Sequence, residues 1–296
     1  MSSRTTSISA RSVDRRADCG SAKPVLEIVG GPGGVTQSSL RELWAFRDVY
    51  TAFTLRQVKV KYKQAAIGVG WAVFQPLVSA LLFTVFLGRL VHVPSDGMPY
   101  LVFALLGMAC WSYFSGAASS AMESLVADQA IIRKIYFPRE LLPLAAVSSS
   151  LLDFAVGLAV ALTAAWSYGY DPGITWLALP LPALLLVLTA TALGLGVSSL
   201  NVFYRDVRYA VPFLLQLALF ATPVFYPLSQ VPASWREPYA IAYPPAAAID
   251  AMRQIVGDRA WPDLTVFGAA LAWVSMLVLL SYVLFKRLER QLADRI

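Results

Sequence analysis

The apolar runs of this chain are long, and their length decides in which solvent the chain can fold. Residues 67–90 and 176–200 each exceed the ~20 residues that an α-helix needs to cross ~30 Å of hydrocarbon, and similar runs recur along the chain. Only 14% of the 296 residues are charged, whereas an ordinary soluble domain has about 25%. The sequence therefore predicts an all-α membrane protein.

Six apolar segments are predicted to be transmembrane helices. They lie at residues 67–90, 100–121, 140–168, 176–200, 210–229 and 264–285. Pro76 interrupts the first segment, and Pro180 and Pro182 interrupt the fourth. We expect kinks at these prolines, because neighbouring helices in a bundle can satisfy the backbone groups that proline leaves free. Residues 67–285 thus form the predicted six-helix transmembrane domain.

The basic residues predict on which side of the membrane each loop lies. They concentrate in residues 1–66, 122–139, 201–209 and 286–296, which hold 20 of the 24 lysines and arginines. Because cytoplasmic loops are enriched in Lys and Arg, we expect a multi-pass protein of the bacterial inner membrane with both termini in the cytoplasm. This sidedness accounts for the net charge of +6, so no nucleic-acid partner is expected.

The two ends of the chain are predicted to be cytoplasmic tails. Residues 1–39 carry mostly small and polar side chains without apolar periodicity, which is typical of a flexible tail. This stretch lacks the apolar core of a cleaved signal peptide, so we expect the first span to direct membrane insertion. Residues 286–296 form the basic C-terminal tail.

Residues 40–66 predict an amphipathic helix in the membrane interface, followed by a basic juxtamembrane segment. Apolar and aromatic side chains recur at helical spacing between residues 40 and 57, with charges between them. The lysines that follow are placed to meet anionic lipid headgroups. The residues expected to contact membrane lipids, and to receive a substrate from the interface, are Trp44, Phe46, Tyr50, Lys59, Lys61 and Lys63.

Residues 123–140 form an amphipathic stretch that is too polar to span the bilayer and too apolar for a plain loop. Pro138 ends this stretch. Two interpretations follow from the residues alone. The stretch is either a helix that rests on lipid headgroups or a helix that inserts into a cytoplasmic partner protein.

Several motifs, in the same order along the chain, resemble the ABC-2 type permease family of bacterial surface polysaccharide exporters. They are KYKQ at 61–64, WAVFQP at 71–76, IIRKIYFPR at 131–139, NVFYRDVRY at 201–209, PF at 212–213 and PVFYP at 223–227. The resemblance extends from about residue 40 to the C-terminus. The chain departs from the family pattern at residues 243–245, where Tyr-Pro-Pro stands in place of the Asn-Pro of many relatives.

The resemblance implies a permease subunit that exports lipid-linked O-antigen, teichoic-acid or related surface polysaccharide. It also implies the partners, because in this family two permeases assemble with two ABC ATPase subunits, which bind ATP and Mg²⁺. The amphipathic stretch then becomes a coupling helix that docks on the ATPase. The residues expected to make this contact are Ile131, Arg133, Lys134, Ile135, Tyr136, Phe137, Pro138 and Arg139.

We expect no catalytic site, cofactor or metal ion in this chain. It has no Gly-x-x-x-x-Gly-Lys-Ser/Thr phosphate loop, so ATP hydrolysis must come from a separate subunit. Its single histidine and two cysteines are too isolated in sequence to clamp a metal ion. Gly194 and Gly196 lie deep in the fourth apolar segment and are expected to permit close helix packing.

A polymer path needs weak, repeated contacts, which aromatic rings supply by stacking on sugar faces. The candidates for lining this channel are Trp71, Phe74, Trp111, Tyr113, Phe114, Phe220, Phe225 and Tyr226. For each single ring, core packing or a position in the interfacial belt is the alternative. Residues 230–263 are rich in proline and aromatic side chains, which predicts a pair of short re-entrant helices at the periplasmic exit.

Three other functions were weighed against polysaccharide export. An ABC-2 permease for a small hydrophobic cargo would need no wide aromatic path. A membrane-embedded lipid-linked sugar transferase would need clustered acidic residues at one membrane face, which the sequence lacks. A proton-driven transporter would carry ionisable residues in several spans, whereas here Asp153 stands alone. We expect Asp153 to face the protein interior.

Overall fold

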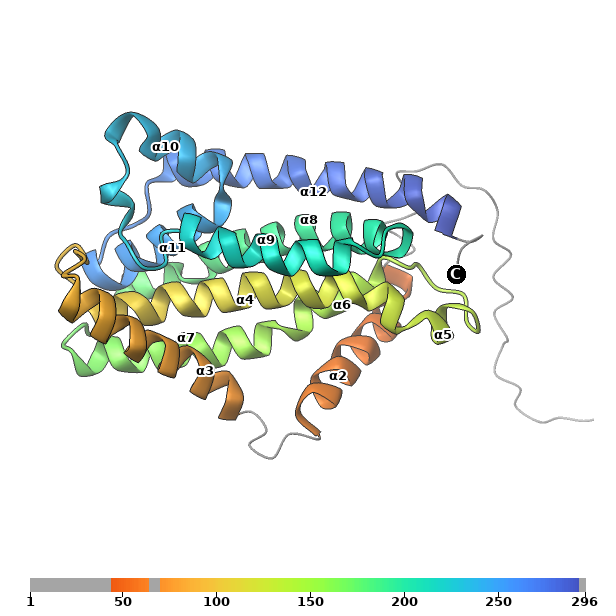
Figure 1. The fold of residues 1–296 in the computed structure, drawn as a ribbon, viewed down its shortest axis with the longest axis horizontal. Coiled ribbons are helices and arrows are strands. Elements are labelled where there is room, and N and C mark those ends of the chain that lie inside the picture. Colours follow the sequence, from red (N-terminus) through yellow and green to blue (C-terminus); the bar gives the residue numbers. More distant parts are fainter. Residues whose placement is uncertain (1–43, 64–69, 293–296) are drawn as a thin grey trace, which may run out of the picture. The chain divides into compact units, whose positions relative to one another are not determined.

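The computed structural model describes residues 44–63 and 70–292 (Figure 1). Within these ranges the regular structure is helical, as the apolar runs predict. The predicted tail at residues 1–39 and the end of the C-terminal tail, residues 293–296, lie outside the described residues.

Long apolar helices alternate with short helical turns along the chain. In order they are α2 (Arg47–Lys63), α3 (Gly70–Phe83), the π-helix η1 (Thr84–Leu90), α4 (Tyr100–Ala127), α5 (Gln129–Ile132), α6 (Leu141–Ser149), α7 (Leu151–Ser167), the 3₁₀-helix η2 (Ile174–Ala178), α8 (Pro180–Phe203), α9 (Val207–Ala221), the 3₁₀-helix η3 (Leu228–Gln230), α10 (Ala233–Ala242), α11 (Pro244–Arg253), the π-helix η4 (Gln254–Asp258) and α12 (Leu264–Leu292).

Five helical segments among the described residues are long and apolar enough to cross a membrane. They are Val73–Leu90, Tyr100–Ala127, Leu141–Ser167, Ile174–Phe203 and Leu264–Glu289. The fifth predicted span, residues 210–229, is instead the 15-residue helix α9, which is only ~22 Å long. It ends at Ala221 because Thr222 is extended ahead of Pro223, and a residue before proline disfavours helical geometry.

The prolines of the fourth segment begin a helix and do not kink one. Pro180 is the first residue of α8 and Pro182 lies in its first turn, where backbone N–H groups have no intrahelical partner to lose. The kink predicted at this position is therefore wrong, and the 3₁₀ turn η2 precedes the helix instead. Pro76 does lie inside α3.

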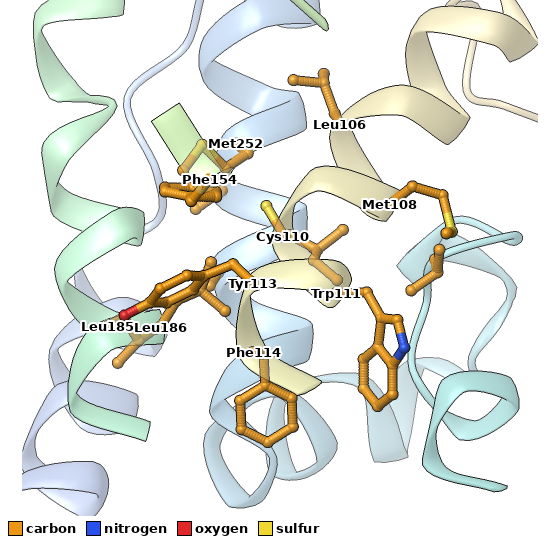
Figure 2. Packing of buried hydrophobic residues seen from close by; sticks show 14 of the residues in the cluster. Leu106, Met108, Cys110, Trp111, Tyr113, Phe114, Phe154, Leu185, Leu186 and Met252 are labelled. Atoms are coloured by element: carbon orange, nitrogen blue, oxygen red, sulfur yellow. The ribbon is translucent and has the colours of Figure 1, made fainter. Parts of the chain in front are cut away.

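α4 is the centre of the fold. It packs against α3, α6, α7, α8, α9 and α11 (Figure 1). Of its apolar window, 78% is buried, against 11% for the window that includes α3 and 17% for that of α12. Figure 2 shows side chains leaving α4 in opposite directions, with Trp111 on one side and Cys110 on the other. Protein therefore covers most of α4, whereas α3 and α12 present most of their surface outward.

Gly194 allows α8 to lie directly against α4. A Cβ atom built at Gly194 would lie 2.7 Å from the Cβ of Ala121, which is closer than two non-bonded carbon atoms can approach. A Cβ atom at Gly196 would lie 3.5 Å from Ser281 Oγ on α12, an ordinary contact. The predicted packing role thus applies to Gly194, whose lack of a side chain sets the distance between the two helices.

The connecting segments gather at the two ends of α4. Beyond its C-terminal end lie α5 and the loop that leads to α6, near the start of α2. At its N-terminal end, Tyr170 donates a hydrogen bond to the carbonyl of Gly97 (3.4 Å), and Arg259 pairs with Asp171 (3.7 Å). Figure 1 shows α5 at one end of α4 and α11 at the other.

Candidate functional site

The loop between α4 and α6 contains the sequence predicted as a coupling helix. α4 ends at Ala127, and α5 continues for only four residues, Gln129–Ile132. The chain then turns at residues 133–135 and becomes irregular as far as Pro138. The predicted amphipathic stretch of residues 123–140 is thus helical in part, as the end of α4 and as α5, and it is not helical beyond Ile132.

Only the tip of this loop is accessible. Arg133, Lys134, Ile135 and Tyr136 are exposed, and the Ile135 and Tyr136 side chains are 63% and 64% exposed. Phe137 and Pro138 are buried, and the flanking Ile131, Ile132 and Arg139 are partly buried. We call residues 133–136 the loop tip. Phe137, which was expected to contact a partner, faces the interior of this chain.

Three contacts anchor the base of the loop to other helices. The Phe137 ring lies 5.2 Å from the ring of Phe53 on α2. Asp128 accepts a hydrogen bond from Arg56, also on α2, at 2.8 Å. Glu140 is 1% exposed and pairs with Lys286 on α12 at 2.8 Å. Burial raises the pKa of Glu140, and Lys286 opposes this shift. The base of the loop is therefore in contact with α2 and α12, in addition to the two helices that it joins, α4 and α6.

These anchors could not be found from the sequence. Arg56 and Asp128 are 72 residues apart, and Glu140 and Lys286 are 146 apart. Charge patterning detects pairs at helical spacing, three or four residues apart. The sequence does show acidic residues on both sides of the basic motif, Asp128 and Glu140. It does not indicate with which basic residues they pair.

The residues predicted for the membrane interface lie in α2 and just before it. Some of them pack against protein and the others are exposed. Phe46 and Tyr50 are partly buried and pack with Phe53, and Tyr50 is hydrogen-bonded to Ser148 on α6. This face of α2 is therefore occupied by protein. The side chains that remain exposed are those of Trp44, Lys59, Lys61 and Lys63.

A cavity of about 560 Å³ lies between α2, α3, α4 and α7, with Leu219 of α9 at its edge. Three of the predicted channel residues, Trp71, Trp111 and Tyr113, line this cavity. Trp71 is half exposed, whereas Trp111 is buried. These three residues come from α3 and α4, and their place in a channel stays a prediction.

An ion pair lies at the wall of the same cavity. Lys61 of α2 donates a hydrogen bond to Asp153 of α7, and both residues line the cavity. Asp153 therefore faces the protein, as expected. Its second carboxylate oxygen and the hydroxyl of Tyr62 are buried, and neither has a hydrogen-bond partner among the described residues. Such groups remain available to a bound polar molecule.

The other predicted channel residues do not join this cavity. Phe74 packs edge-on against Trp71, with ring centroids 5.5 Å apart. Phe225 lies 3.8 Å from the ring of Phe83 and is buried. Phe220 is 65% exposed. The buried Phe114 packs on Trp111 with ring centroids 5.6 Å apart, and Tyr226 is partly buried. The eight rings therefore occupy several surfaces.

The region before the last span contains the predicted pair of short helices. α10 is mostly exposed, whereas almost every residue of α11 is buried. Among the described residues, no group of three or more His, Cys, Asp or Glu side chains could hold a metal ion.

Comparison with known proteins decides the family. The model of the ABC-2 type transporter family matches residues 49–256, a range that contains α4, the loop tip and the cavity. The chain belongs to the ABC-2 type transporter family. It is therefore a multi-pass permease subunit without catalytic activity of its own, and membership of this family implies an ATPase partner.

Curated relatives in this family are named for O-antigen export. The O-antigen export system permease protein RfbA of Klebsiella pneumoniae is 29% identical over 206 residues, which are 68% of this chain and 77% of that protein. The protein of the same name from Myxococcus xanthus is 29% identical over 198 residues, or 65% of this chain and 73% of its own length. The similarity supports polysaccharide export at the level of the family.

Proposed function

We propose that this chain is the membrane subunit of an ATP-driven exporter that moves a lipid-linked surface polysaccharide, such as an O-antigen, from the cytoplasm to the periplasm. Two copies would assemble with two ATPase subunits in the bacterial inner membrane. The observation that carries the proposal is the similarity to O-antigen export permeases over about two thirds of the chain.

The cavity chemistry supports a sugar cargo over a small hydrophobic one. Indole rings stack on the apolar faces of sugars, and Trp71 and Trp111 line the cavity wall. Sugar hydroxyls need hydrogen-bonding partners, which Gln75, Lys61 and Asp153 offer at the same wall. The second carboxylate oxygen of Asp153 and the hydroxyl of Tyr62 are buried without a hydrogen-bond partner among the described residues. A purely apolar cargo would leave both groups so, at a cost of about 1–3 kcal/mol for each one.

The short helix α9 supports assembly of two copies. Its 15 residues are too few to cross the bilayer alone, and its large apolar side chains Phe213, Leu214, Leu217 and Phe220 are more than half exposed. A second copy packed on this face would surround α9 with protein on both sides, where a short helix and the irregular backbone that follows it are tolerated.

Transport by reconstituted permease and ATPase tests the proposed cargo. Trp71→Ala and Trp111→Ala are each expected to lower ATP-dependent movement of lipid-linked glycan into vesicles about fivefold, because a lost stacking contact removes on the order of 1 kcal/mol. Trp166→Ala is the control, since Trp166 is 62% exposed and lies outside the cavity. Equal transport by all three variants, or transport of a small apolar cargo in place of glycan, would contradict the proposal.

Cysteine labelling tests the proposed orientation. In a background with Cys19→Ser and Cys110→Ser, Pro94→Cys at the N-terminal end of α4 should react with a membrane-impermeant maleimide added to intact cells. Asp206→Cys, between α8 and α9, should react only after the cytoplasmic side is opened. Both positions are exposed, so burial does not limit the reaction. The reverse pattern would place both termini in the periplasm.

A further inference from the structure

Between α9 and α10 the backbone is mostly not helical. Its carbonyl groups there accept hydrogen bonds from side chains. α9 ends at Ala221, whose carbonyl accepts hydrogen bonds from Tyr239 of α10 and from Tyr226. The carbonyl of Phe225 accepts a hydrogen bond from Tyr100 of α4 at 2.8 Å. We call residues 222–227 the α9–α10 strap. Its backbone is held by side chains of neighbouring elements in place of helical hydrogen bonds.

Arg253 of α11 donates hydrogen bonds to two carbonyl groups of the strap. Its guanidinium donates hydrogen bonds to the carbonyls of Pro223 at 2.6 Å and Val224 at 2.8 Å. A third bond runs to the carbonyl of Phe103 on α4 at 3.1 Å, and the guanidinium carbon lies 3.3 Å from the centre of the Phe103 ring. One side chain thus joins α11, the strap and α4.

A charge at this depth needs these partners. Arg253 is 7% exposed, and removing an ionised group from water is strongly unfavourable unless hydrogen bonds compensate it. Its Nε is buried without a partner among the described residues, so the compensation comes from the bonds of the two Nη atoms. Burial lowers the pKa of Arg253 to about 9, and Asp250 opposes this shift, so the guanidinium stays charged at neutral pH. Arginine's planar fork suits several carbonyls at once, whereas the compact ammonium of lysine does not.

Gly107 provides the space for this arrangement. A Cβ atom at Gly107 of α4 would lie 2.7 Å from Nη2 of Arg253 and 2.9 Å from the carbonyl oxygen of Val224. Any side chain at this position would push the guanidinium away from the strap. The carbonyls of Phe103, Pro223 and Val224, with the space at Gly107, form the binding position of the guanidinium, which we call its first seat.

A second seat adjoins the first. Arg253 also lines a cavity of about 260 Å³, whose wall carries the carboxylates of Asp96, Asp250 and Asp258. Burial raises the pKa of Asp250, and Arg253 opposes this shift, which indicates that the two charges act on each other. A guanidinium that left the carbonyls would find carboxylates across this cavity, so both positions satisfy the charge.

We propose that Arg253 is the positioning residue of the outer gate, a latch that holds the strap on α4 when the path is closed and moves to the carboxylates of the adjoining cavity when it opens. The inference rests on the proposed function, since the strap is an outer gate only if cargo leaves at this end. Hydrogen bonds from a charge to carbonyls suit a latch because carboxylates and water offer the released guanidinium equivalent partners.

The test uses Val224→Cys in the full-length protein without native cysteines, because Val224 is 0% exposed. Impermeant maleimide added to intact cells should label the thiol at position 224 at least tenfold faster when Arg253→Met is added. Arg253→Lys should give an intermediate rate, because it keeps the charge but loses the fork. Gly107→Ala should act like Arg253→Met without changing any charge, and Gly157→Ala is its control, because a Cβ there meets only Ala109 at 3.5 Å.

Two further variants distinguish release of the strap from partial unfolding of the whole protein. Ala117→Cys, at a position that is 0% exposed in α4, should stay unlabelled in every variant. Asp250→Asn removes a negative charge from the second seat, so the thiol at position 224 should stay protected while export falls at least fivefold. Protection of that thiol in both Arg253→Met and Gly107→Ala, or labelling at position 117 alongside position 224, would overturn the latch. Labelling requires neither glycan nor ATPase, so failure of the proposed cargo would not change it.

Discussion

Replacing both Ile135 and Tyr136 by alanine is expected to detach the ATPase from the permease almost completely. These side chains are 63% and 64% exposed at the loop tip, which is where a partner can reach them. Truncating a buried anchor at an interface costs about 2 kcal/mol or more, so two losses should weaken binding several hundredfold. Lys134→Ala should cost less, because a rim charge contributes mainly to the association rate.

The measurement is capture of the ATPase by purified permease, scored beside permease abundance in the membrane. Abundance should not change, since residues 133–136 are exposed. Tyr204→Ala is the matched control, because Tyr204 is also 64% exposed but lies between α8 and α9. If the double variant keeps the ATPase and Tyr204→Ala loses it, the docking site lies in that second loop and residues 133–136 only rest on headgroups.

Gly194→Ala is expected to destabilise the permease by about 3 kcal/mol, near the upper end for overpacking of a core. The new methyl group would lie 2.7 Å from the Cβ of Ala121, and a shift of α4 would disturb its packing against α3, α6, α7, α9 and α11. Thermal unfolding in detergent should shift to a lower temperature, and abundance in the membrane should fall.

Two variants make this result specific. Gly196→Ala should change stability by less than about 0.5 kcal/mol, because its Cβ would make only an ordinary contact with Ser281. Adding Ala121→Gly to Gly194→Ala should recover most of the loss by removing the opposing methyl group. Stability that stays low in the double variant would show that the clash is not between these two carbons.

The helical class and most spans could be predicted from the sequence, because the length of an apolar run is a local property. The fifth predicted span could not. Hydropathy continues through residues 222–229, although Pro223 is a local signal for the end of α9. The hydrogen bonds that hold the backbone beyond this point come from Tyr100 and Arg253, which are distant in sequence. Pro180 is a second example, because it is the first residue of α8. From the local sequence alone, a proline that begins a helix cannot be distinguished from one that interrupts it.

The candidate site divides in the same way. The motif at residues 131–139 located the loop, but the direction of each side chain depends on contacts that no local pattern contains. Phe137 faces inward because Phe53 lies opposite it, and Tyr136 faces outward. Likewise, Trp71 and Trp111 were chosen as aromatic residues, and only the packing of α3 on α4 brings them to one cavity.

The burial of α4 has a consequence for biogenesis. α4 is the second long helix to leave the ribosome, before α7, α8 and α11 exist to cover it. The surface of α4 is therefore expected to contact lipid first and protein later, which is the order of two-stage membrane folding. Small residues such as Ala117, Ala118 and Ala121, all 0% exposed, let each later helix replace lipid at close range. We therefore expect α4 to be the helix on which the later helices pack during synthesis.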